Sequence, residues 1–81
     1  MRGKKEYRPL QKETLLQFMS TPQARKAGVT VMEIMMYTGI GDPRARIRDL
    51  IDDGHKILKV WEVKKYPGKR TVRYRRYYLV D

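Results

Sequence analysis

The stretch TVMEIMMYTGIGDPRARIRDLIDDG, which runs from Thr30 to Gly54, decides the fold of this chain. Thr30 is followed three residues later by Glu33, and this spacing is typical of a capping box at the start of a helix. Gly39 is the residue type that ends a helix in the left-handed conformation. The first half of the stretch therefore predicts a helix over residues 31–38.

A second helix is expected directly after the glycine turn. Asp42 followed by Pro43 is an N-cap residue followed by the proline that is favoured in a first helical turn. Three apolar residues then share one helical face: Ile47, Leu50 and Ile51. Gly54 is placed to end this helix near residue 53. Two short helices joined by a tight turn make a helix-turn-helix.

The segment before this motif predicts one further helix. Apolar residues recur near helical spacing behind Pro9, which predicts an amphipathic helix over residues 10–20. Residues 21–28 contain a Thr-Pro step and end in glycine, so they are expected to form a connecting loop. Val29 is a candidate for a minimal strand.

Two segments in the last third of the chain predict a β-hairpin. Residues 57–66 and 71–80 are rich in β-branched and aromatic residues, and Pro67-Gly68-Lys69-Arg70 separates them. A Pro-Gly pair is typical of a type II turn. Apolar residues occupy both parities of the strands, so a bulge or two-sided burial is expected near the base, with Tyr77 and Leu79 in the core.

These elements predict an α+β fold, a winged helix-turn-helix with a three-helix core and a C-terminal two-stranded β-hairpin as the wing. A chain of 81 residues holds one small domain, which we expect over residues 9–81, preceded by a flexible basic arm over residues 1–8. The absence of cysteine rules out disulfides and cysteine-ligated zinc. No transmembrane run or apolar signal core is visible, so we expect a soluble cytoplasmic protein, associated with the nucleoid when it binds DNA.

Positive charge is concentrated in the final third of the chain. The whole sequence has 19 Lys and Arg against 9 Asp and Glu, a net charge of +10. Nine of these bases lie within residues 56–76, where Glu62 is the one acid. Such a density of like charge indicates a polyanionic partner, because the charges repel one another unless something neutralises them. The plainer alternative is a solvated surface that keeps the protein soluble.

The start of the second motif helix is the first candidate for DNA contact. A helix of this kind fits the major groove with its N-terminal side chains nearest the base edges. Four residues occupy that end: Arg44, Ala45, Arg46 and Arg48. Arginine suits bidentate contact with guanine, and a small alanine permits close approach. In the competing interpretation, Arg48 only pairs with Asp52 one turn further on.

The hairpin turn is the second candidate, because mobile basic side chains surround it. They are expected to contact the DNA backbone or a minor groove: Lys64, Lys65, Lys69, Arg70 and Arg73. Further backbone contacts are expected for Thr30, at the start of the first motif helix, and for Lys4 and Lys5 in the arm.

Several other side chains receive structural assignments. Trp61 is expected to anchor the core, and three methionines are expected mainly to fill it: Met32, Met35 and Met36. Either Arg75 or Arg76 is expected to pair with Glu62. No phosphate-binding glycine loop, carboxylate pair or metal-ligand cluster is visible, so we expect a protein that is not an enzyme and that uses no cofactor and no metal.

From Thr30 onward the chain resembles the winged helix-turn-helix domains of small bacteriophage and prophage regulators. The matching residues are Thr38-Gly39-Ile40, Pro43, Ala45-Arg46-Ile47, Asp49-Leu50, Gly54, Ile57 and Arg76-Tyr77-Tyr78-Leu79. The resemblance implies a three-helix core with a two-stranded wing, and a third helix that reads DNA in transcriptional control or phage recombination. It also implies that Arg46 anchors either a phosphate or the fold, which leaves Arg44 and Arg48 to choose the sequence.

The sequence thus predicts a sequence-preferring double-stranded DNA-binding protein, a small phage-type transcriptional regulator or recombination accessory factor, and allows a homodimer or cooperative assembly on DNA. Two alternatives stay open. One is RNA or single-strand binding through the basic, tyrosine-rich hairpin. The other is a protein-binding module that docks an acidic partner on its positive surface.

Overall fold

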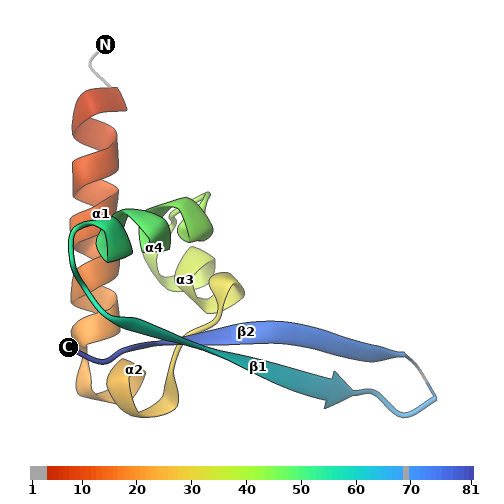
Figure 1. Cartoon of the computed structure of the whole chain (residues 1–81). Coiled ribbons are helices and arrows are strands. Elements are labelled where there is room, and N and C mark those ends of the chain that lie inside the picture. Colours follow the sequence, from red (N-terminus) through yellow and green to blue (C-terminus); the bar gives the residue numbers. More distant parts are fainter. Residues whose placement is uncertain (1–3, 69) are drawn as a thin grey trace.

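The chain folds into a cluster of helices with a long β-hairpin that projects beyond them (Figure 1). The computed structural model describes residues 4–68 and 70–81, and the side chains of residues 9–68 and 70–81. The elements, in chain order, are α1 (Lys4–Ser20), α2 (Pro22–Ala27), α3 (Val31–Thr38), α4 (Pro43–Asp52), β1 (Ile57–Lys65) and β2 (Thr71–Leu79). This arrangement confirms helices followed by a C-terminal hairpin.

Helices α3 and α4 form the predicted helix-turn-helix. The Thr30 hydroxyl accepts a hydrogen bond from the Glu33 backbone N–H at 3.1 Å, and the Glu33 carboxylate accepts one from the Thr30 N–H at 3.0 Å. Gly39 ends α3 with a φ of 76°, a left-handed conformation that side-chain-bearing residues avoid. The Asp42 side chain caps α4, and Pro43 occupies its first turn. The expected capping box, glycine stop and N-cap are therefore confirmed.

The core lies where α1, α3, α4 and the base of the hairpin meet. Six large side chains in it are almost completely buried: Leu15, Met19, Ile34, Ile40, Ile47 and Leu50. Tyr77 and Leu79 of β2 complete the core, with exposed fractions of 4% and 3%. The expected return of the last strand to the core is confirmed.

Helix α1 begins at Lys4, six residues before the expected start. Pro9 is the sixth residue of the helix, so its ring removes one intrahelical donor, and the helix extends for little more than one turn before it. Residues 4–8 therefore belong to α1, and the flexibility expected for residues 1–8 stays a prediction. Residues 1–3 lie outside the described residues.

The expected loop over residues 21–28 is also wrong, because it contains α2. The Thr21 hydroxyl accepts a hydrogen bond from the Ala24 N–H at 3.2 Å, so Thr21 is an N-cap, and Pro22 occupies the first turn. Gly28 ends the helix with a φ of 76°. The described part of the chain therefore has four helices where the sequence predicted three.

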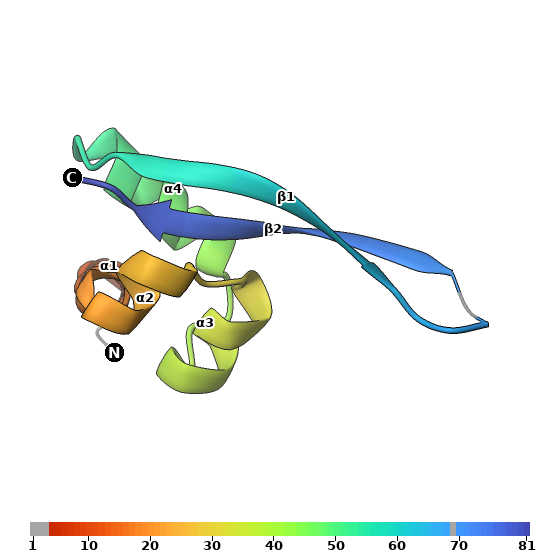
Figure 2. The same cartoon turned by 90° about the horizontal axis from the view of Figure 1, so that it is seen from below.

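The hairpin is antiparallel and its register is unbroken from Ile57 opposite Leu79 to Lys65 opposite Thr71. Of the two expected alternatives, the bulge is absent from the described strands, whereas residues 76–79 of β2 are buried or half-buried on both faces. The two strands twist strongly around each other (Figure 2). Val29 pairs with Tyr77 through one isolated bridge, so the expected minimal strand is confirmed. Gly68 at the turn has a φ of 67°, as a type II turn requires at its second central position.

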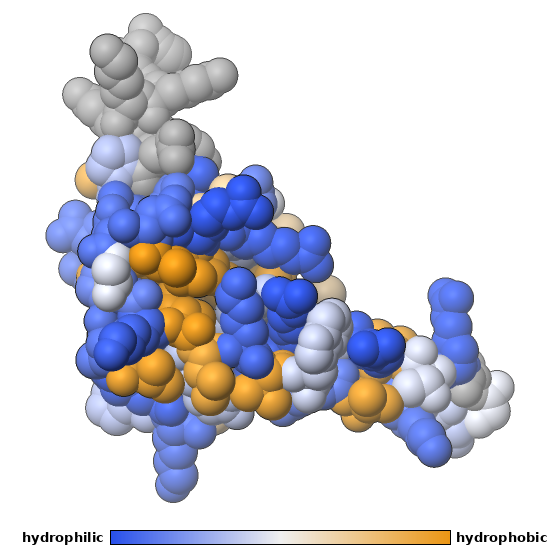
Figure 3. Space-filling model, viewed as in Figure 1, coloured by the Kyte–Doolittle hydropathy of each residue, from blue (hydrophilic) through white to orange (hydrophobic). Residues whose placement is uncertain are grey.

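The length of the hairpin makes its outer half a projection. Each strand has nine residues, or roughly 30 Å at about 3.4 Å per residue. Among the described residues of the hairpin, the buried side chains all lie at its base, so the part beyond Trp61 extends past the core by roughly 15 Å. Its surface is mostly hydrophilic with small apolar patches (Figure 3). No helix in the described ranges is long and apolar enough to cross a membrane.

Candidate nucleic-acid interface

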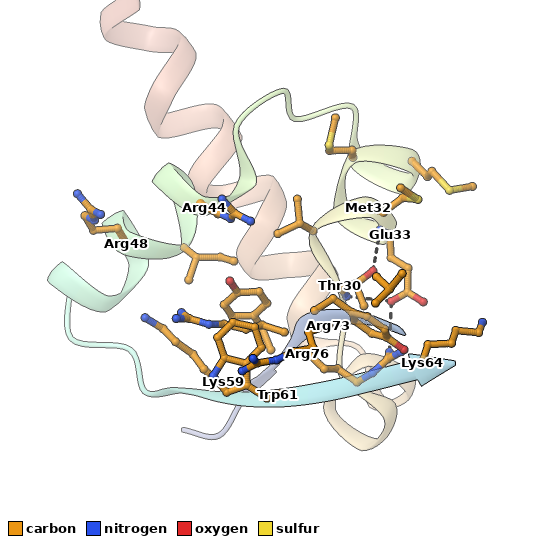
Figure 4. A pocket seen from close by; sticks show the side chains of 18 of the residues that line it. Thr30, Met32, Glu33, Arg44, Arg48, Lys59, Trp61, Lys64, Arg73 and Arg76 are labelled. Atoms are coloured by element: carbon orange, nitrogen blue, oxygen red, sulfur yellow. Dashed lines mark hydrogen bonds and ion pairs between the residues drawn. The ribbon is translucent and has the colours of Figure 1, made fainter. Parts of the chain in front are cut away.

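An open groove lies between the helix-turn-helix and the hairpin. Its volume is about 1140 Å³, and it is bordered by α3, α4 and residues from both strands of the hairpin (Figure 4). Seven basic residues line it: Arg44, Arg48, Lys59, Lys64, Arg73, Arg75 and Arg76. Among the described lining residues Glu33 is the one acid. The groove is therefore a concentrated positive surface.

Helix α4 contributes two exposed arginines, Arg44 and Arg48, to the groove. They are four residues apart, so they share one face of the helix. Arg48 forms no ion pair with Asp52 or with any other described carboxylate. The competing interpretation of Arg48 as a local pairing residue is therefore wrong. Ala45 is half-buried beside Arg44.

The hairpin contributes the remaining basic residues of the groove. Of the five expected wing contacts, Lys64 and Arg73 line it, whereas Lys65 and Arg70 are exposed outside it. Lys69 lies outside the described residues. Lys59 and Arg75 also line the groove and were not predicted as contacts.

The register explains these two positions. Lys59 lies opposite Tyr77, whose side chain is buried in the core. Cross-strand partners project from the same face of a sheet. Tyr77 was expected in the core. With the register known, its cross-strand partner Lys59, and Arg75 two residues before it, would therefore have been placed on the same inward face of the hairpin.

The helix order, the hairpin and this basic groove agree with a comparison against known protein families. The family model described as a winged helix-turn-helix domain matches residues 15–81. The chain belongs to this family. Neither the curated proteins nor the solved structures contain a significant match to it. Membership in the winged helix-turn-helix family indicates DNA as a partner and a typically non-catalytic role.

In this winged helix, Arg46 supports the fold and does not flank the exposed face of α4. Its exposed fraction is 9%. Its guanidinium lies 3.0 Å from the Asp49 carboxylate and donates a 3.3 Å hydrogen bond to the Gln11 side chain of α1. Arg46 thus lies at the contact between α1 and α4, which is the fold-anchoring alternative that the resemblance implied, and it is not one of the side chains exposed on α4.

Arg76 ties the wing to the helix-turn-helix. Its guanidinium lies 3.1 Å from the Glu62 carboxylate and 3.5 Å from that of Glu33, the capping-box residue of α3. It also donates to the Ala27 and Gly28 carbonyls, each at 3.5 Å. The expected pairing of Glu62 with one of the two adjacent arginines is confirmed for Arg76.

The titration of this cluster is consistent with a tight structural link. Hydrogen bonds from Arg76 and then from Tyr74 hold the pKa of Glu62 below its usual range. Burial acts to lower the pKa of the Arg76 guanidinium, but the bonds to Glu62 and Tyr74 outweigh it and raise that pKa above its usual value. Arg76 is therefore held as a cation by the fold, and its charge is already compensated.

Trp61 was expected in the core, and that expectation is wrong. Its exposed fraction is 55%, because it lies beyond the part of the wing that reaches the helices. The guanidinium carbons of Arg75 and Arg73 lie 4.7 Å and 5.0 Å from its ring centroid. Trp61 is therefore a platform for two cations on the groove side of the wing.

The methionines of α3 were expected to be mainly core filling, and that is also wrong. Met32, Met35 and Met36 have exposed fractions of 69%, 46% and 71%. Ile34 alone supplies the fully buried position of this short helix. The three methionines add an apolar border to the basic groove.

The remaining ionisable groups form no metal site. Among the described residues, no group of three or more His, Cys, Asp or Glu side chains is arranged to hold a metal ion. His55 lies 3.0 Å from the Asp81 carboxylate. Partial desolvation acts to raise the pKa of Asp81, but the hydrogen bond and charge of His55, with backbone hydrogen bonds, outweigh it and leave that pKa below its usual value.

Proposed function

We propose that this protein binds double-stranded DNA with a preference for sequence, as a small phage-type transcriptional regulator or recombination accessory factor. One observation carries the proposal. The recognition helix and the wing present six basic side chains to a single concave face, and none of the six is paired with a described carboxylate. Only Arg76, the seventh base of the groove, is neutralised within the fold.

In the proposed complex, α4 enters the major groove by its N-terminal half. Arg44 and Arg48 contact base edges or adjacent phosphates, and half-buried Ala45 leaves room for the helix to approach. Asp52 lies further along α4 and would repel phosphate, which limits how far the helix can insert. Arg46 is assigned to the fold and makes no contact with the bases.

The wing and the start of α3 contact the sugar-phosphate backbone. Lys64 and Arg73 bind it from the groove, and the exposed Lys65 and Arg70 extend the contact toward the tip, together with Lys69. The Thr30 hydroxyl accepts the Glu33 N–H, so its own proton is available for a phosphate oxygen. The side chains of Lys4 and Lys5 lie outside the described ones, and we propose them as further backbone contacts from their charge alone.

Exposure of the tyrosines favours duplex over single-strand binding. Base stacking on the wing requires exposed aromatic faces. Of the four hairpin tyrosines, only Tyr66 is exposed, whereas Tyr74 and Tyr78 are half-buried and Tyr77 is buried. Most of the tyrosine rings that the single-strand alternative requires for base stacking are therefore packed within the protein.

A competition experiment tests the proposal. A labelled duplex bound to the protein is challenged with unlabelled duplex, single-stranded DNA or RNA at equal nucleotide concentration. We expect unlabelled duplex to displace the label most efficiently. More efficient displacement by single strands or RNA would contradict the proposal. Recovery of a stoichiometric acidic protein after nuclease treatment, without duplex binding, would instead support the protein-docking alternative.

We further propose that the protein assembles on DNA as a homodimer or cooperatively. Specific sites are commonly read by pairs of such domains on two half-sites. The exposed methionines of α3 supply an apolar surface of the kind found at interfaces. Sedimentation of the protein with one-site and two-site duplexes tests this. Strictly independent binding of single copies would contradict it.

A further inference from the structure

The wing carries a cation–aromatic cluster for which the general DNA-binding role gives no assignment. Trp61 of β1 lies directly opposite Arg75 of β2, and Arg73 is the next residue of β2 on the same face. Both guanidinium carbons lie within 5.0 Å of one indole centroid. The two cations therefore converge on one ring and lie within about 10 Å of each other, although like charges repel.

No acid on the described surface holds these two arginines in place. Arg76, one residue away, is anchored by Glu62 and Glu33. Arg73 and Arg75 form no ion pair with any described carboxylate. The indole ring is therefore their fixed contact, and their charge remains uncompensated on the groove side of the wing.

The chemistry of a stacked guanidinium determines what such a cluster can bind. A guanidinium that lies over an indole uses its planar face, and its N–H donors point outward in the plane. Those donors match the oxygens of a phosphate in a bidentate geometry. Because the ring already holds the side chain in place, less rotamer freedom is lost when the phosphate binds.

We propose that Trp61, Arg73 and Arg75 form a preorganised clamp for the backbone phosphates of one DNA strand, with Trp61 as the positioning residue and the arginines as the binding residues. This rests on the proposed function. The clamp lies on the wing and borders the same groove as Arg44 of the recognition helix (Figure 4). It therefore grips the backbone next to the segment whose bases α4 reads.

A phosphate fits this cluster better than an unpaired base does. A base would need to stack on the indole, where the guanidiniums already lie 4.7 Å and 5.0 Å from the centroid. Stacking would displace at least one cation from the ring. A phosphate binds the outward donors and leaves both cation–aromatic contacts intact.

The test is a double-mutant cycle on the full chain, read by anisotropy of a labelled 20-base-pair duplex. Trp61→Leu leaves every charge in place, so we expect it to weaken binding about 5- to 10-fold, because the two arginine side chains would then lose rotamer freedom when they bind phosphate. Trp61→Phe should recover most of the loss. Arg73→Gln with Arg75→Gln should weaken binding and make the salt slope shallower by about 2. Thermal melting of each variant verifies folding.

The coupling between the substitutions decides the role of Trp61. We expect Trp61→Leu to have no further effect when Arg73 and Arg75 are already glutamine, because the tryptophan acts through them. An equal loss in both backgrounds would mean that Trp61 contacts DNA by itself, and would overturn the clamp. Tyr66→Leu is the matched control, since this exposed wing aromatic holds one cation, Lys64, at 5.7 Å.

The controls separate failure of the clamp from failure of the proposed function. An effect of Tyr66→Leu as large as that of Trp61→Leu would assign the loss to wing aromatics in general and overturn the clamp. Unchanged affinity of Trp61→Leu, with normal duplex binding by the parent protein, would overturn the clamp alone. Failure of the parent to bind duplex would overturn both proposals.

Discussion

Replacement of the two groove arginines of α4, Arg44→Gln with Arg48→Gln, should change the salt dependence of duplex binding by a defined amount. Each phosphate neutralised by a protein cation releases counterions, so log affinity falls against log salt by about 0.9 per contact. Both side chains are exposed and neither forms an ion pair with a described carboxylate. Their removal should therefore weaken duplex binding and hardly change the free energy of unfolding.

The magnitude follows from the lining of the groove. Seven bases line it, and Arg76 is compensated by Glu33 and Glu62, which leaves six available cations. If all six meet phosphates, the groove contributes about −5.4 to the parent slope, and the double variant should retain about −3.6 of this contribution. Between 50 and 200 mM salt the groove contribution should cost the parent about 10³-fold in affinity, and the double variant only about 10²-fold.

The assay is anisotropy of a labelled duplex at four or five salt concentrations. Lys26→Gln with Lys56→Gln is the matched control, because it removes two exposed charges that do not line the groove. It should leave the parent slope unchanged. A parent slope shallower than about −2, or a control that changes the slope as much as the α4 variant does, would refute the assignment of the groove as the DNA-binding face.

Three further predictions concern the base of the wing and the different roles of α4 and the wing in DNA binding. Gly28→Ala should lower the free energy of unfolding by about 2–4 kcal/mol in a denaturant titration. The φ of Gly28 is 76°, and an added Cβ would lie 2.6 Å from Arg76 Cγ and 2.7 Å from Tyr78 Cζ. A free energy of unfolding equal to that of the parent would contradict this. The Arg76 bond lowers the pKa of Glu62 in the folded state, so its stabilising effect is complete above the unfolded pKa of about 4.3 and is lost as the pH falls through the folded value. Glu62→Gln should therefore flatten the acidic limb of a plot of Tm against pH, and an unchanged limb would show that the pair does not contribute. Arg48→Ala should alter the preference between duplex sequences, whereas Arg70→Ala should weaken all of them alike; the reverse pattern in a binding panel would mean that the two roles are inverted.

The helix-turn-helix was predictable because its signals are local. Capping at Thr30 and Asp42 and the glycine stop at Gly39 depend on residues within one helical turn, and all three are present in the structure. Local signals did not predict the helix within residues 21–28. Thr21-Pro22 is equally a turn signal and an N-cap followed by a first-turn proline, and the helical choice is stabilised by burial of Ala24.

The errors at Trp61 and the methionines have a different origin, because burial depends on tertiary placement. A large apolar residue in a strand is usually placed in the core, but Trp61 lies on the part of the wing that extends beyond the helices. Arg46 shows the converse error. Its position at the N-terminal end of the motif helix grouped it with the DNA-contacting residues, yet Gln11 of α1 and Asp49 contact its guanidinium.

The groove itself was only partly predictable. Arg44, Arg48, Lys64 and Arg73 were found from their positions in the motif helix and around the hairpin turn. Lys59 and Arg75 required the register of the hairpin, which the sequence did not determine while the alternation of its strands was imperfect. The density of positive charge thus indicated a polyanionic partner, whereas the pairing of the strands was needed to find that Lys59 and Arg75 line the groove.

Selection from a random duplex DNA library at physiological salt tests sequence-preferring duplex binding most directly. The pure protein is mixed with the library, and the retained molecules are sequenced. We predict enrichment of a defined motif, whose symmetry would report dimeric or tandem binding. Tight retention without an enriched motif would contradict sequence preference, and no retention of duplex at all would contradict DNA binding by this winged helix.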